Sequence, residues 1–192
     1  MKMKNTLSMS KVIFLTLLVL ISVSCNESSA QEQEMAEEQN ARLVTSPQKE
    51  ESTFFVAIAE NELADLEAAK LAAKKCTNAE VKKFASRLVV DHIKSSLQLK
   101  ELAYERNIAL PTSLTDDEKG KYNKLSANSA SNFDKQFLNE MIDDYKKSIK
   151  NIEVVSADRK DQRFKDWSTN KTGTLIAQLM KANMLKEKLN YN

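Results

Sequence analysis

The chain has 192 residues, with 29 basic and 27 acidic side chains, and its length suits one domain with appendages. It contains only two glycines and two prolines, and 6% of its residues are aromatic, a composition that disfavours a β-sheet and favours long helices. The near balance of charge, without a basic stripe, argues against a nucleic-acid-binding protein.

The first 24 residues have the features of a secretory signal. Lys2, Lys4 and Lys11 precede the apolar run 12–23, and small residues follow it. This run is shorter than the roughly 20 residues that cross a bilayer, so a permanent membrane helix is the weaker interpretation. Without residues 1–24 the chain holds 26 basic and 27 acidic residues.

Residues 22–25 read SVSC and resemble the lipobox of bacterial lipoproteins, in which signal peptidase cuts before a cysteine that becomes acylated. Ser24 fits that pattern, whereas Ser22 stands where an aliphatic residue is usual. The resemblance implies acyl chains on Cys25 that anchor the protein in a membrane. We therefore expect it in the cell envelope, at the outer membrane, with its domain in the periplasm or at the cell surface. Cys76 would then be the remaining thiol.

The rest of the chain divides into a tether and a helical part. Residues 26–45 are polar, with five glutamates, and indicate an acidic tether. Four long segments of helical periodicity follow from residue 46 onward. The first ends near Cys76, and a capping-box pattern from Thr77 to Glu80 starts the second. The third begins near Phe133 and the fourth near Asp161.

A long polar connection separates the second helix from the third, and the pair Thr115 and Glu118 predicts a short helix inside it. Two short loops and one long crossover are typical of ferritin-like bundles. We therefore expect an all-α fold, a ferritin-like antiparallel four-helix bundle with a long crossover between helices two and three. The predicted divisions are a lipoprotein signal peptide (1–24), the acylated cysteine and tether (25–45) and the four-helix domain (46–192).

Several motifs occur in the order found in one known family. Residues 78–85 match N-x-x-V-K-x-F-A, Asp-His-x-Lys follows at 91–94, and the third helix opens with FDKQFL at 133–138. The stretch from Phe54 to about Leu189 resembles the secreted bacterial ferritin-like family of unknown function whose members are labelled outer-membrane proteins. The resemblance implies a fold and a location but no reaction.

The single histidine, His92, lies on the apolar stripe of the second helix. The family usually has further histidines in its third and fourth helices, where this chain has Tyr145 and Gln178. Di-iron proteins of this fold carry Glu-x-x-His motifs, but Val89 stands three residues before His92. The pattern therefore argues against a ferroxidase-type site.

Four polar side chains lie on the apolar faces, one on each long helix. Glu62 and His92 are equally distant from the first turn, so an antiparallel hairpin places them in one layer. We expect a closed buried network in which Glu62 pairs with His92 and Tyr145 with Gln178. The alternative is a Zn or Fe ion held by Glu62, Glu67 and His92.

These patterns predict an envelope-anchored lipoprotein with a non-enzymatic binding or structural role, such as one in envelope stress. No catalytic residue is expected, because a pair of Ser95 and His92 would also need an orienting acid and an oxyanion hole, and Asp91 points about 100° away around the helix. No cofactor is expected either. The expected partners are the membrane, through Cys25, and an unidentified protein. The alternative function is a metal-binding bundle that buffers or oxidises a transition metal near His92.

Overall fold

The computed structural model describes residues 34–36, 38–41, 46–157 and 160–191. The predicted signal peptide and Cys25 lie outside these residues. The named helices are α3 (Ser46–Lys75), α4 (Ala79–Tyr104), α5 (Asp116–Ala127), α6 (Ala130–Ala157) and α7 (Gln162–Tyr191). No β-strand occurs in the described ranges, so the all-α prediction is confirmed.

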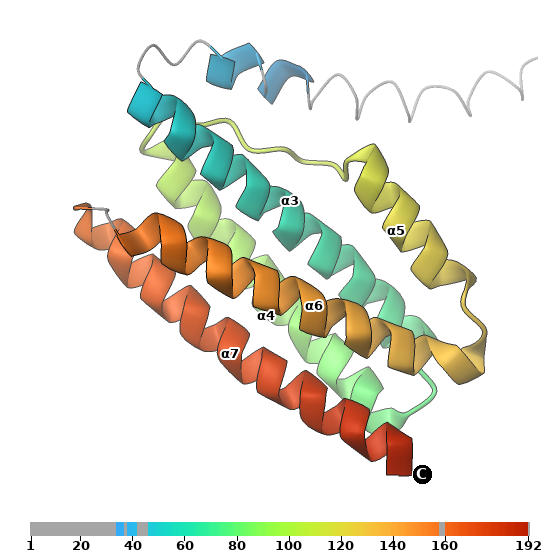
Figure 1. Cartoon of the computed structure of the whole chain (residues 1–192). Coiled ribbons are helices and arrows are strands. Elements are labelled where there is room, and N and C mark those ends of the chain that lie inside the picture. Colours follow the sequence, from blue (N-terminus) through green and yellow to red (C-terminus); the bar gives the residue numbers. More distant parts are fainter. Residues whose placement is uncertain (1–33, 37, 42–45, 158–159, 192) are drawn as a thin grey trace, which may run out of the picture.

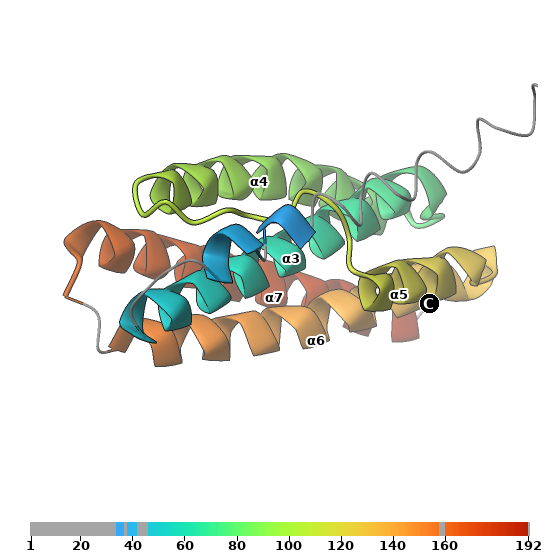
Figure 2. The ribbon, with the colours of Figure 1, turned by 90° about the horizontal axis from the view of Figure 1, so that it is seen from above.

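The four long helices lie side by side, with neighbours running in opposite directions (Figure 1). α3 packs against α4 and α6, and α7 packs against α6 and α4. α3 and α7 therefore occupy one diagonal of the arrangement, and α4 and α6 the other. The crossover runs back along α3, and α5 lies against α3 and α6 at one end of the molecule (Figure 2).

A single apolar core fills the space between the long helices, as their helical spacing predicts. Burying one Phe or Leu side chain stabilises the fold by about 1.5–3 kcal/mol. At the end of the core near the start of α7, the rings of Phe54 and Phe164 meet edge to face with centroids 5.6 Å apart. The largest fully buried apolar side chains are Phe55, Leu88, Leu99, Leu125, Phe133, Phe137, Leu138, Met141, Ile152, Phe164 and Leu175.

The N-terminus of α4 differs from the sequence prediction. Its N-cap is Asn78, whose side-chain oxygen accepts hydrogen bonds from the backbone N–H groups of Glu80 and Val81. Thr77 instead donates its hydroxyl to Asp134 of α6 at 3.1 Å. The predicted Thr77 capping box was wrong because the Asp134 carboxylate engages Thr77 from another helix. The predicted box at Thr115 and Glu118 is confirmed at the start of α5.

Part of the predicted tether contacts the crossover. Residues 34–36 and 38–41 are helical. The Asn40 side chain donates to the Ala109 carbonyl at 3.0 Å and accepts from the Ala109 N–H at 3.1 Å. These two bonds attach the segment to the crossover. Within the described residues, no helix combines the length and apolar character that spanning a bilayer requires.

Asp134 of α6 makes several polar contacts with the α3–α4 connection and so joins the two helical hairpins. It accepts hydrogen bonds from the backbone N–H groups of Thr77 and Asn78 as well as from the Thr77 hydroxyl. Asp134→Ala should lower the free energy of unfolding by about 2–3 kcal/mol, because it removes the acceptor of three partly buried donors at Thr77 and Asn78. Asn78→Ala should cost only about 1 kcal/mol, the value of one N-cap. Urea denaturation measures both, and equal losses would contradict this assignment.

Candidate functional site

A buried carboxylate lies at the middle of the four long helices. Glu62 on α3 is 4% exposed, and its Oε2 lies 3.0 Å from Nδ1 of His92 on α4. Its other oxygen, Oε1, is paired with the Nζ of Lys171 on α7. The pairing of Glu62 with His92 that the sequence predicts is therefore confirmed, and Lys171 is an additional partner.

The surroundings of Glu62 keep it ionised. Burial alone opposes the charge, but the hydrogen bond from His92 and the positive charge of Lys171 outweigh it and lower the pKa of Glu62 to about 2. An ionised carboxylate only accepts hydrogen bonds, so Nδ1 of His92 carries the hydrogen and donates it. The charge of Glu62 is thus compensated from two other helices.

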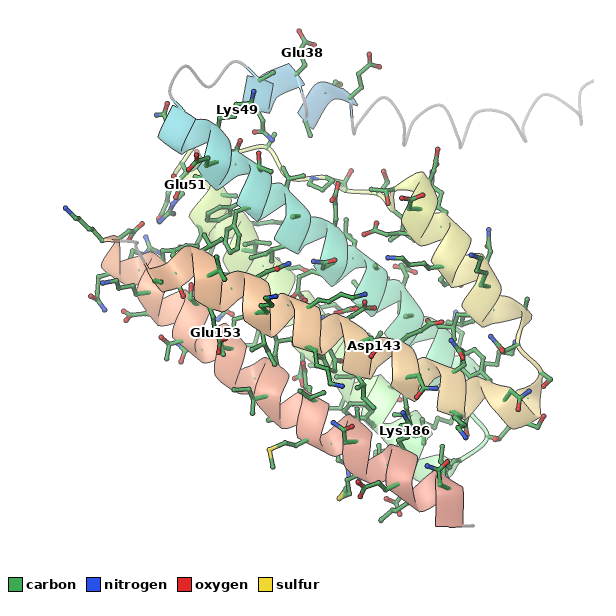
Figure 3. All side chains as sticks on the ribbon, in the orientation of Figure 1. Glu38, Lys49, Glu51, Asp143, Glu153 and Lys186 are labelled. Atoms are coloured by element: carbon green, nitrogen blue, oxygen red, sulfur yellow. The ribbon has the colours of Figure 1, made fainter. Side chains whose placement is uncertain are left out.

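Both diagonals of the helical arrangement meet at this cluster. The Lys171 side chain reaches Glu62 across the α3–α7 diagonal. On the other diagonal, the His92 ring stacks on the Tyr145 ring of α6, with centroids 6.5 Å apart and planes 23° apart. Burial raises the pKa of Tyr145 well above its usual range, so its hydroxyl stays neutral. Figure 3 shows the side chains that the long helices direct toward one another.

The predicted pairing of Tyr145 with Gln178 was wrong. Gln178 donates to Asp91 of α4 at 3.5 Å, and the Tyr145 hydroxyl has no hydrogen-bond partner in the part of the chain that the structure describes. The reason is register. Tyr145 lies twelve residues before the end of α6, whereas Gln178 lies sixteen residues after the start of α7. This offset of four residues is about one helical turn, roughly 6 Å along the axis.

The sequence predicted a closed network of buried hydrogen bonds, but the observed network is open. Several buried polar atoms near the cluster lack a partner among the described residues: His92 Nε2, Ser95 Oγ, Tyr145 Oη, Ser168 Oγ and Gln178 Oε1. Buried polar groups normally have partners, so each of these atoms is an exception. Both oxygens of the Glu62 carboxylate have partners, whereas several polar atoms around it have no hydrogen-bond partner among the described residues.

Two charged residues of this region were not identified from the sequence. Lys171 follows Phe164 and Trp167 and precedes Leu175 at helical spacing, and it is 7% exposed. Asp65 lies one turn after Glu62 and is 4% exposed. Their spacing on the apolar stripes was the signal that could have revealed them.

Of the three alternative metal ligands, Glu62 and His92 meet but Glu67 lies elsewhere. Glu67 lies five residues after Glu62, which is about 140° around the helix, and it pairs instead with Lys70 at 2.7 Å. Among the described residues, no group of three or more His, Cys, Asp and Glu side chains is arranged to hold a metal ion.

Asp65 has an environment opposite to that of Glu62. Burial, together with the negative charges of Asp144 and Glu62, raises its pKa to about 7, although His92 and Lys171 oppose this. No described residue donates a hydrogen bond to it. A pocket of about 310 Å³ between α3, α6 and α7 opens onto Glu62, Asp65 and Lys171. Asp65 thus combines a raised pKa with access to a pocket, a combination that marks candidate functional residues.

The sequence was matched by the model of one known protein family. A family described as Domain of unknown function (DUF4142) matches residues 30–185. The chain belongs to this family. The match to DUF4142 spans all five named helices up to residue 185 of α7, together with residues 30–45 before them.

The helical fold also occurs in a solved structure. A crystal structure of a DUF305 fragment from Deinococcus radiodurans is similar, with a TM-score of 0.63 and 12% sequence identity. The similarity covers 72% of this DUF4142 chain and 95% of the fragment. At this identity the likeness shows the fold alone. No curated protein matches the chain.

The two carboxyl groups should affect stability in opposite pH ranges. The pKa of Glu62 falls from 4.5 to about 2 on folding, so its stabilising contribution is present above about pH 4.5 and is lost as pH falls toward 2. The pKa of Asp65 rises from 3.8 to about 7, so stability should decrease as pH rises from about 4 to about 7. The groups facing Asp65 are Glu62, His92, Asp144, Tyr145 and Lys171.

Asp65→Asn should therefore raise the urea midpoint at pH 8 and leave it nearly unchanged at pH 4. Glu62→Gln should lower the midpoint at pH 7 and have less effect near pH 2. Urea titrations from pH 2 to pH 8 measure these differences. If the urea midpoint of Asp65→Asn changed with pH in the same way as that of the wild type, the pKa of Asp65 would not be raised in the folded protein.

Proposed function

We propose that the protein is a lipid-anchored envelope protein with a structural or binding role and without enzymatic activity. In this proposal the four long helices form a ferritin-like bundle, and the cluster of Glu62, His92 and Lys171 fixes their register. The short α3–α4 and α6–α7 connections and the long crossover with α5 support the ferritin-like assignment. The SVSC pattern ending at Cys25 supports the lipid anchor and an envelope location.

The observation that supports the structural role is that both His92 and Lys171 compensate the charge of Glu62. In di-iron proteins of ferritin-like architecture, inward-pointing glutamates bind metal ions. Here the inward-pointing glutamate is bound by the imidazole of His92 and the ammonium group of Lys171. A lysine ammonium beside the carboxylate supplies the positive charge itself and repels a further cation. The residues present are therefore better suited to joining helices than to holding a metal.

A buried ion pair adds little net stability over apolar packing, but separating its partners is strongly destabilising because each charge then lies buried without compensation. Slipping one helix by a turn would separate Glu62 from His92 or Lys171 and leave a buried charge uncompensated. The cluster therefore selects one register of α3, α4 and α7 over its neighbours. This is a structural role and needs no substrate.

Mutation of the ion pair tests the structural role. Glu62→Gln should reduce the free energy of unfolding by about 3–5 kcal/mol, because it leaves Lys171 as an uncompensated buried charge. Lys171→Met should cost less, because His92 still donates to Glu62. The double variant should recover part of the loss, with a coupling energy of about 0.5–3 kcal/mol. Chemical denaturation of the four proteins measures the cycle.

The exposed Lys165 on the same helix provides the matched control, and Lys165→Met should change stability by less than about 0.5 kcal/mol. Additive losses at Glu62 and Lys171 would contradict direct coupling. Zn²⁺ or Fe²⁺ should not shift the melting temperature beyond the shift seen with an unrelated protein. A stoichiometric shift that His92→Gln abolishes would instead establish the metal-binding alternative, because a ligand bound to the native state stabilises it.

The anchor is tested at Cys25. Mass spectrometry of the mature wild-type N-terminus should find an acylated cysteine, because the apolar run and Ser24 precede it as in lipoprotein precursors. Cys25→Ser should abolish acylation and leave the precursor uncleaved by lipoprotein signal peptidase. Cys76→Ser changes the other cysteine and should be processed normally. An unmodified N-terminus that begins at another residue would overturn the lipoprotein assignment.

A further inference from the structure

A second pocket, here called the α5 pocket, lies between α3, α5 and α6. Its volume is about 270 Å³. On α3 it is lined by one helical face that includes Ala64, Asp65 and Ala68, and the two short alanine side chains leave space beside the aspartate. α5 contributes Tyr122 and α6 contributes Met141, so the pocket has apolar as well as polar walls.

Asp65 lies at the inner side of the α5 pocket. It is 4% exposed, yet it lines both this pocket and the one that opens onto Glu62 and Lys171. No described side chain or backbone group donates a hydrogen bond to its carboxyl. The nearby lysine, Lys171, is already paired with Glu62. A buried carboxylate without a donor is costly to the fold, so Asp65 can accept a donor from a ligand that enters the pocket.

The remaining carboxyl groups of the α5 pocket have partners or lie at its rim. Glu118 accepts from the Thr115 N–H as part of the α5 cap, and Glu140 accepts from Gln136 at 3.1 Å. Asp144 pairs with Lys147 at 3.6 Å. Asp143 is exposed on α6 (Figure 3). The pocket holds five carboxyl groups against three lysines, so a positively charged ligand is favoured over an anion.

We propose that the α5 pocket binds a small aliphatic diamine, with one ammonium group on the Asp65 carboxylate and the second toward Asp144 and Glu140. An ammonium group needs one carboxylate and a few further acceptors, and Asn61 and Asn128 offer amide oxygens in the same lining. Ca²⁺ and Mg²⁺ take six or more oxygen ligands. The methylene chain of a diamine fits beside Tyr122 and Met141. This inference goes beyond the proposed structural role, and either can fail without the other.

Isothermal titration of the purified full chain with 1,4-diaminobutane at pH 8 tests the proposal. Binding should be one to one and should strengthen from pH 6 to pH 8, because the carboxyl must lose its proton when the ammonium group binds. Titration in buffers of different ionisation enthalpy measures the released proton. The uncharged 1,4-butanediol, which has the same length, should not bind.

Asp65→Asn keeps the shape of the side chain and should weaken binding of the diamine at least tenfold. The matched control is Asp166→Asn, which removes an exposed carboxylate on α7, and its affinity should equal that of the wild type. Thermal melts confirm that both variants are folded. Absence of binding to the wild type, or equal affinity in Asp65→Asn, would overturn the proposal. If the wild type bound Mg²⁺ more tightly than the diamine and Asp65→Asn lost this binding, the ligand would be a metal ion and the proposal of a diamine would be wrong.

Discussion

The need to compensate one buried negative charge restricts how the helices can come together. An ionised carboxylate in the protein interior costs several kcal/mol unless donors and positive charge surround it. Glu62 obtains both, from His92 of α4 and from Lys171 of α7. Because the compensating groups come from separate helices, the charge can be buried only when these helices have reached their observed register. Apolar packing tolerates small shifts, whereas this contact does not.

Glu62 and Asp65 show how strongly position decides the behaviour of one chemical group. They lie one turn apart on α3 and are equally buried. His92 and Lys171 hold the pKa of Glu62 low, and burial raises that of Asp65 toward neutrality. At neutral pH and above, the ionised Glu62 therefore stabilises the fold, whereas ionisation of Asp65 destabilises it. A buried group with a strongly shifted pKa beside a pocket is a candidate for a functional site.

The sequence predicted most of the helical architecture but only part of the polar interior. Equal spacing from the first turn placed Glu62 opposite His92 correctly, because a short connection leaves little freedom of register. Tyr145 and Gln178 lie at unequal distances from the second turn, which separates them by about one helical turn. Asn78 rather than Thr77 caps α4, because Asp134, distant in sequence, binds Thr77. Such tertiary contacts cannot be read from a local motif.

Lys171 could have been found from its place on the apolar stripe of α7, but its partner could not. Nothing local to either residue indicates that a lysine on the last helix reaches a glutamate on α3 across the diagonal. The raised pKa of Asp65 likewise depends on which charges surround it, and these come from α4, α6 and α7. The burial of a charged residue can therefore be predicted from the pattern of one helix. Its partner and its pKa depend on the other helices as well.

The contact between Glu62 and Lys171 also bears on the order in which the chain folds. It joins the beginning of the described helices to the last of them, so it forms only after nearly the whole chain is present. In a hairpin of α3 and α4 alone, Glu62 would pair with His92, while its side toward Lys171 of α7 would be open to water. Contacts of such long sequence separation slow folding, because the loop entropy is lost before the contact forms. Full compensation of this buried carboxylate therefore requires the last helix.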